Sequence, residues 1–229
     1  MKKLHLLSLA AALAVATMVL IACGKSDSGG DQTDNGTGND PLTYDAGVVI
    51  NGVKWATRNV DAPGTFTPTP QDPGMLYQWN RIKGWSLPPI ANVIDPNWND
   101  TEAPGNTWES ANDPCPAGWR VPTLDELRAF VDIVNNIEPP TFTVTPAGDF
   151  IFGSGDNVVF FPGSRGSLNY SDGSLVLVGR SSDYWSSTPM SPDTNVDQSK
   201  AYFLELGNDG YGSNYSMRSD GFFVRCIAK

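Results

Sequence analysis

Short apolar runs separated by long polar stretches dominate the chain from residue 41 onward. The first two runs flank Asn51-Gly52, the dipeptide preferred by tight hairpin turns that need positive φ at both central positions. The sequence therefore predicts a hairpin over residues 48–55. Further runs with the β-branched and aromatic composition of strands are 150–152, 158–161, 175–178, 184–187, 201–206 and 222–227. This pattern predicts a domain built mainly from short strands.

Helical periodicity is sustained in one stretch, residues 123–137. Apolar residues recur there on one helical face; they are Leu124, Leu127, Phe130, Val131, Val134 and Ile137. Thr123 and Glu126 have the spacing of a capping box, and two consecutive prolines end the pattern. A second, shorter helix is predicted over residues 107–111, with Asn106 as its N-cap.

The first 40 residues have a different composition from the rest of the chain. Two lysines precede an apolar run that ends in Leu20-Ile21-Ala22-Cys23, the pattern of a bacterial lipobox. We expect residues 1–22 to be a lipoprotein signal peptide and Cys23 to carry lipid, with a plain secretory signal or an uncleaved anchor as the alternatives. Residues 23–40 are mostly Gly, Ser, Asp, Asn and Thr, which predicts a flexible stalk.

Charge and lipidation together indicate where the protein is and which partners it has. The chain carries 25 acidic and 15 basic residues, a formal net charge of −10, so nucleic acid is not an expected partner. Acyl chains on Cys23 would bind a bilayer without spanning it. We expect a lipid-anchored protein of the cell envelope, in the outer membrane and exposed at the surface.

Cysteine and histidine content limits the chemistry of the mature chain. Cys115 and Cys226 remain after the lipobox cysteine, and the single histidine, His5, lies in the signal peptide. In an oxidising envelope the two cysteines are expected to form a disulfide, closing a loop of about 110 residues worth roughly 4–5 kcal/mol; two buried thiols are the alternative. Without histidine, Ser-His-Asp and Cys-His nucleophiles and His-containing zinc sites are excluded. No catalytic residue is predicted.

Four separated blocks of sequence, at 49–60, 113–123, 184–188 and 221–226, resemble the Fibrobacter major paralogous domain family. Residues 119–127 and the closing Gly-Phe-x-x-Arg-Cys are also distantly similar to the formylglycine-generating-enzyme, or sulfatase-modifying, branch of the C-type-lectin-like fold. The resemblance implies that residues 41–229 form one α+β C-type-lectin-like domain. Such a domain has a twisted antiparallel sheet, two helices, adjacent first and last strands and long loops.

Oxygen-bearing side chains alternate along one polar segment, at Asp95, Asn97, Asn99 and Asp100. Calcium loops present their ligands in this way, and the segment contains the Trp-Asn-Asp triplet known from calcium-dependent lectins. The alternative is an Asp-Pro turn whose side chains cap backbone groups. Calcium is therefore the one cofactor that the sequence leaves open.

The polar stretch at residues 207–220 has the composition of a recognition loop, because Tyr supplies rigid contact area and Asn and Ser supply adaptable hydrogen bonds. Its candidate ligand-binding residues are Asn208, Asp209, Tyr211, Asn214, Tyr215 and Arg218, with Arg165 and Tyr170 as helpers. An ordinary solvated hairpin loop is the alternative. Three tryptophans in the earlier loops, Trp79, Trp85 and Trp98, either stack on a sugar or pin those loops to the domain.

These observations predict a non-catalytic binding module that recognises an extracellular or envelope protein or a glycan through its loops. The first alternative is a structural or assembly component of the envelope or of a pilus. The second is a hydrolase that uses two carboxylates, although no motif singles out such a pair.

Overall fold

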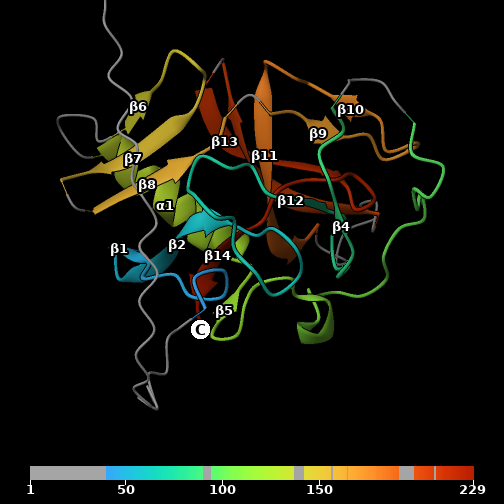
Figure 1. The fold of residues 1–229 in the computed structure, drawn as a ribbon, viewed down its shortest axis with the longest axis horizontal. Coiled ribbons are helices and arrows are strands. Elements are labelled where there is room, and N and C mark those ends of the chain that lie inside the picture. Colours follow the sequence, from blue (N-terminus) through green and yellow to red (C-terminus); the bar gives the residue numbers. More distant parts are fainter. Residues whose placement is uncertain are drawn as a thin grey trace, which may run out of the picture. The chain divides into compact units, whose positions relative to one another are not determined.

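The computed structural model describes residues 40–89, 94–136, 142–155, 157–163, 165–190, 199–208 and 210–229 (Figure 1). The predicted signal peptide and Cys23 lie outside the described residues. Within these ranges the protein is mostly β, with antiparallel sheets, one α-helix and one disulfide. No helix in the described ranges is both long and apolar enough to cross a membrane.

The first and last strands of the described chain meet in one four-stranded sheet. Its order is β1 (Val48–Ile50), β2 (Val53–Asn59), β14 (Arg225–Ala228) and β5 (Trp119–Arg120), with every neighbouring pair antiparallel. The predicted Asn-Gly hairpin is confirmed, because φ is 50° at Asn51 and 75° at Gly52 between β1 and β2. Residues from both ends of the domain are thereby held together.

The other strands form four smaller antiparallel sheets. One three-stranded sheet contains β11 (Ser181–Pro189), β12 (Lys200–Gly207) and β13 (Gly210–Met217), and a second contains β6 (Phe142–Val144), β7 (Phe150–Ser154) and β8 (Asn157–Phe161). Two-residue strands make the pairs β3 (Leu76–Tyr77) with β4 (Gly84–Trp85), and β9 (Ser167–Leu168) with β10 (Leu175–Val176). Each predicted run overlaps one of these strands or β14, although the strands at 175–178 and 222–227 are shorter than expected.

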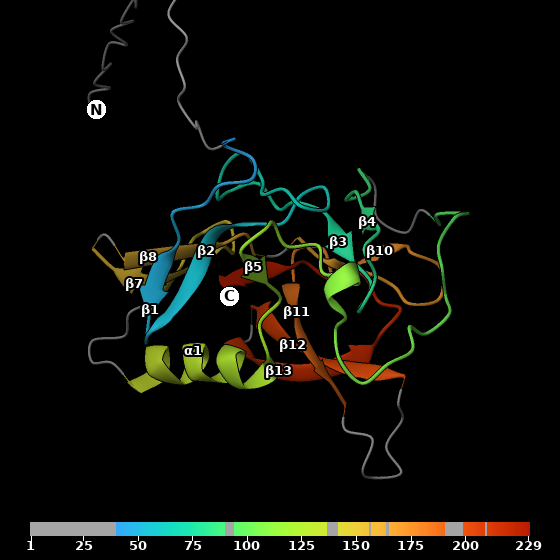
Figure 2. The same cartoon turned by 90° about the horizontal axis from the view of Figure 1, so that it is seen from below.

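The predicted long helix is confirmed as α1 (Leu124–Asn136). Its capping box forms, since the Thr123 hydroxyl and backbone N–H both donate to Glu126 Oε2, at 2.9 and 2.8 Å, and Glu126 N–H donates back to the Thr123 hydroxyl at 3.3 Å. Arg120 also donates to the same carboxylate. Figure 2 shows α1 beside β12 and β13 and across from β1 and β2.

The second predicted helix, at residues 107–111, is wrong. The structure has only a three-residue 3-10 turn at Ser110–Asn112, without a side-chain cap. Other hydrogen bonds replace helical ones in this segment. Glu109 N–H donates to the side chain of Asn80 at 2.8 Å, and the Trp108 indole donates to the Asn112 carbonyl at 2.9 Å. The described residues therefore contain one α-helix where the expected fold has two.

Aromatic side chains fill the core in two clusters. The first lies between α1, β2, β7, β8 and the β11–β13 sheet, and its buried rings are Trp55, Trp85, Phe130, Phe150, Phe152, Phe161, Tyr184 and Phe223. The second includes Phe66, Tyr77, Trp79, Trp108, Trp119, Trp185, Phe203 and Phe222, together with Cys226. Burying each ring is worth about 1.5–3 kcal/mol, so these clusters supply the main apolar stabilisation of the described chain.

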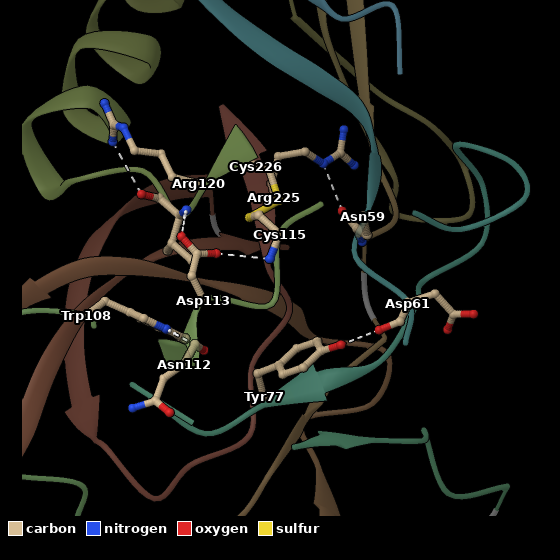
Figure 3. Close-up of a disulfide and its surroundings, with 11 residues drawn as sticks. Asn59, Asp61, Tyr77, Trp108, Asn112, Asp113, Cys115, Arg120, Arg225 and Cys226 are labelled. Carbon is tan, nitrogen blue, oxygen red and sulfur yellow. Dashed lines mark hydrogen bonds between the residues drawn. A yellow bond between two sulfur atoms is a disulfide. The ribbon is translucent and has the colours of Figure 1, made fainter. Parts of the chain in front are cut away.

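The predicted Cys115–Cys226 disulfide is confirmed, with Cα atoms 6.0 Å apart (Figure 3). Its surroundings are fixed by hydrogen bonds: the Asp113 carboxylate accepts from the backbone N–H of Cys115 at 2.9 Å. Beside Cys226, the buried Arg225 guanidinium donates to Asn59 Oδ1 at 2.9 Å and to two backbone carbonyls. The bond joins the segment before β5 to the last strand.

Candidate functional site

Residues 210–217 form strand β13 rather than the predicted loop. All eight residues pair with β12, from Gly207 opposite Gly210 to Lys200 opposite Met217. The polar composition that suggested a loop is compatible with a strand because β12 supplies a full set of backbone partners. Successive side chains of a strand point to opposite faces, so Tyr211 and Tyr215 share one face of the sheet while Gly212 and Asn214 belong to the other.

A cavity of about 400 Å³ lies over this hairpin. We call it the hairpin groove, and its lining residues are Leu177, Arg180, Ser181, Glu205, Gly207, Asn208, Gly210, Tyr211, Gly212, Ser213 and Asn214. Three of these are glycines, and a Cβ at Gly210 or Gly212 would meet no atom within 4 Å. The groove exists because the hairpin lacks side chains at these positions, which also opens its backbone to a ligand.

The groove contains three of the ligand-binding residues predicted from sequence: Asn208, Tyr211 and Asn214. Asn214 Nδ2 donates to Glu205 Oε2 at 3.3 Å, and Asn208 Nδ2 donates to the Gly179 carbonyl at 2.9 Å. These bonds orient both amides at the rim of the groove.

Sequence reasoning missed the two charged residues of the groove, Arg180 and Glu205. Glu205 carries a detectable signal, because it is an acidic residue within the otherwise apolar run at 201–206. Arg180 carries none, since it lies in the turn that precedes β11 and reaches the groove only through the fold. Together they place opposite charges on one small polar surface.

The two tyrosines of β13 differ in what they contact. Tyr211 is partly buried, and its ring meets Phe142, Phe150 and Phe152 at centroid distances of 5.0, 6.5 and 5.7 Å. Tyr215 is 48% exposed and its ring packs against Tyr202. Tyr211 therefore supports the groove from the core, and Tyr215 lies outside its lining.

Arg218 is inside the protein, with 3% exposure, and not on the predicted binding surface. It donates to the carbonyls of Ala103 and Gly105, each at 2.9 Å, and its guanidinium lies 4.3 Å from the Trp79 ring centroid. These contacts hold the loop at 103–105 against the core. Arg218 is consequently a structural residue, buried because a single guanidinium satisfies several carbonyls.

The two predicted helper residues lie apart from the hairpin groove. Arg165 forms an ion pair with Asp149 at 3.3 Å and donates its backbone N–H to Ser182. Tyr170 is 46% exposed, and its carbonyl accepts a hydrogen bond from the Trp98 indole at 2.8 Å. Neither residue lines the groove, and Asp209 lies outside the described residues.

The candidate calcium segment makes local turns. Asp95 Oδ1 accepts the backbone N–H of Asn97 at 2.8 Å, and Asn99 Oδ1 accepts both the N–H and the hydroxyl of Thr101. Asp100 is exposed. This is the turn-capping arrangement that the sequence offers as the alternative. Across the described ranges, no group of three or more His, Cys, Asp or Glu residues is arranged to hold a metal ion.

A buried carboxyl group, Asp183, lies next to the groove residue Glu205 as its direct neighbour across β11 and β12. Burial, and then the negative charge of Glu205, raise the pKa of Asp183 to about 7. Asp220 adds further negative charge, and the Ser167 and Ser181 hydroxyls lower the pKa only in part. Among the described residues, Asp183 Oδ1 has no hydrogen-bond partner.

In the part of the chain that the structure describes, fold and site define a mostly β, antiparallel protein with one α-helix, one disulfide and a small polar groove on a glycine-rich hairpin. Comparison of the chain with models of protein families, with curated proteins and with solved structures finds no match.

Proposed function

We propose that this protein is a non-catalytic, lipid-anchored binding module of the cell envelope that recognises a protein or a glycan through the hairpin groove. One observation carries the proposal: three residues selected from sequence lie around one cavity, and they are Asn208, Tyr211 and Asn214. The charged residues Arg180 and Glu205 line the same cavity. Polar and charged groups at the rim of an open groove suit a hydrated, polar partner.

A C-type-lectin-like fold is the finer architecture that we propose for the domain. Its support is the adjacency of β2 and β14, the helix that follows the Gly-Trp-Arg-Val-Pro turn, and the disulfide that ties that turn to the last strand. In this architecture, the β11–β13 sheet presents the hairpin groove. Binding then depends on backbone and side-chain groups that are already positioned before the ligand arrives.

Filling the groove is expected to weaken ligand binding without unfolding the protein. Gly212 has no positive φ, and a Cβ there would meet open space, so Gly212→Phe places a ring in the groove. Full-length protein in detergent would be applied to a glycan array and to immobilised envelope proteins, and the affinity for each identified ligand measured. We expect at least a tenfold loss, about 1.4 kcal/mol.

Thr143→Phe is the matched control, since it adds a phenylalanine at an exposed position of β6 outside the groove. It should leave the affinity unchanged, and Glu205→Gln and Asn214→Ala should each weaken binding. A ligand that binds the Gly212→Phe variant as tightly as the unaltered protein would show that the groove is not the recognition surface. A monodisperse self-assembly that captures no ligand would instead favour the envelope-assembly alternative.

Lipid attachment at Cys23 has an independent test. When the full chain is expressed in a bacterium, the unaltered protein is expected to enter the detergent phase on phase separation, because buried acyl carbons contribute about 0.8 kcal/mol each to membrane binding. Cys23→Ser should move the protein to the aqueous phase. Mass spectrometry of the N-terminal peptide would identify the acyl groups, and an unmodified Cys23 in the membrane-bound protein would contradict the anchor.

A further inference from the structure

A second cavity, of about 460 Å³, lies between the β3–β4 turn and the loops at 97–112. We call it the loop pocket. Its polar lining includes Arg81, Lys83, Asn97, Asn99, Glu109 and Asn112, and Trp85 forms part of its wall. It shares no lining residue with the hairpin groove. A cavity of this size holds one or two sugar rings, at the lower end of the range for small-molecule sites.

The walls of the loop pocket are held in place by buried amides. Asn80 is 4% exposed and adopts a positive φ of 55°; its Oδ1 accepts the Glu109 N–H at 2.8 Å and its Nδ2 donates to the Pro104 carbonyl at 3.1 Å. Gln78 Nε2 donates to the Asn99 carbonyl at 2.6 Å. A non-glycine residue in this conformation is maintained by its surroundings, so the pocket is preorganised.

Hydrogen-bond donors without acceptors are concentrated at this pocket. Arg81 Nη2 donates to the carbonyl and the hydroxyl of Thr101, at 3.0 and 3.1 Å, while its buried Nε has no partner within the described chain. The buried indole Nε1 of Trp85 also has none. A buried donor without an acceptor keeps an uncompensated desolvation cost. The polar groups around the pocket are therefore richer in donors than in acceptors, which favours a ligand rich in acceptors.

The pocket is also locally cationic in an acidic protein. Arg81 and Lys83 line it against one carboxylate, Glu109, whereas the whole chain has a net charge of −10. Neither cation forms an ion pair with a residue that the structure describes. Lys83 Nζ lies 3.5 Å from the Trp85 ring centroid. Because the ammonium covers that ring face, charge and hydrogen bonds must recognise the ligand rather than stacking on Trp85.

We propose that the loop pocket binds an acidic saccharide of one or two rings, with a sugar carboxylate against Arg81 and Lys83 and sugar hydroxyls against the amides of Asn97, Asn99 and Asn112. Amide side chains both donate and accept, as sugar hydroxyls do. An acidic peptide fits less well, since the anchors of protein partners are mostly Trp, Tyr and Arg in well-packed pockets, whereas polar and cationic groups line the loop pocket. The site is additional to the hairpin groove and does not depend on it.

Calorimetric titration of the full-length protein in detergent tests the proposal. The probes are the disaccharides of galacturonate, glucuronate and mannuronate, with neutral galactobiose as the uncharged counterpart of the first. We expect at least one uronate probe to bind with a Kd below about 1 mM. For the galacturonate pair, the neutral sugar should bind at least about tenfold more weakly, because a charge-assisted contact is lost.

Lys83→Glu is the decisive variant, because Lys83 is exposed and makes no hydrogen bond to the described chain that its loss would break. It should weaken uronate binding at least about tenfold, and Arg81→Gln should do the same. Lys54→Glu is the matched control, since Lys54 also lies over an indole, that of Trp119. It should leave binding unchanged, as should Gly212→Phe in the hairpin groove.

Four results would overturn the acidic-saccharide site. The first is no binding of any uronate disaccharide at about 10 mM. The second is binding of galactobiose as tight as that of the galacturonate disaccharide. The third is uronate binding that Lys83→Glu leaves unchanged. Competition by short oligoglutamate with a lower Kd than the sugars would also overturn it and reassign the pocket to an acidic peptide.

Discussion

Replacing both Cys115 and Cys226 with alanine is expected to lower the free energy of unfolding by about 4–5 kcal/mol. The disulfide spans a sequence separation of 111 residues, and in the chain-entropy model a loop of that length restricts the unfolded chain strongly. The native fold should persist. β14 remains paired with both β2 and β5 through backbone hydrogen bonds, and the aromatic core around Cys226 remains in place.

Urea denaturation followed by tryptophan fluorescence would measure this effect, since all seven tryptophans lie in the chain after residue 50. The unaltered protein in reductant should unfold at the urea concentration at which the double variant unfolds, and reductant should not affect the variant. Each single variant tests the cost of a lone thiol. If the double variant unfolds at the same urea concentration as the oxidised protein, the bond contributes no stability and the loop-closure argument fails.

The features that the sequence predicts correctly are those encoded within a few residues. Asn51-Gly52 specifies its turn because few other residues tolerate positive φ at both positions. Thr123 and Glu126 mark the start of α1 because each satisfies the other's backbone N–H. The disulfide follows from a different argument, that two cysteines in an oxidising compartment pair.

Strand β13 shows where local reasoning fails. Its Gly, Ser, Asn and Tyr residues have no apolar alternation, so residues 210–217 have the composition of a loop. The segment is a strand because the apolar strand β12 pairs with all of it. Pairing with another strand decides whether such a segment is a strand or a loop. Strand β12 can be recognised as the partner only once the hairpin register is known.

The two cavities depend on contacts that no local pattern encodes. Arg218 binds carbonyls more than 110 residues earlier in the chain, at Ala103 and Gly105. Asn80 reaches Glu109 across 29 positions. Side chains such as these determine which loops meet and which polar groups remain available to a ligand. Composition indicated the kind of surface at the hairpin and singled out Trp85, Asn97 and Asn99. Three-dimensional structure added Arg180 to the hairpin groove and brought those three residues together with Arg81 and Lys83 in the loop pocket.

Asp183→Asn is expected to stabilise the protein at pH 8 by a few kcal/mol and to have little effect at pH 4. The pKa of Asp183 is about 7 in the folded protein, against an ordinary value of 3.8. Below about pH 3 the carboxyl is protonated in both states and causes no penalty, and at pH 4, where only the unfolded chain has begun to lose the proton, the penalty is below about 1 kcal/mol. As pH rises toward 7, the unfolded chain loses its proton first, so stability falls; above pH 7 the folded protein holds a buried charge beside Glu205.

Unfolding free energies from urea titrations at pH 4, 6 and 8 would measure this linkage, with each unit of pKa shift corresponding to about 1.4 kcal/mol. Asp220, whose pKa is also raised, to about 6, contributes a pH dependence of the same sign, so the informative quantity is the difference between variant and unaltered protein. Asn cannot ionise but retains a side-chain oxygen that can accept from the Ser167 hydroxyl. Asp125→Asn, on the exposed face of α1, is the control for replacing an Asp by Asn at a site that is not buried. A stability difference that is constant from pH 4 to pH 8 would contradict titration of a buried Asp183 and leave the carboxyl charged beside the hairpin groove.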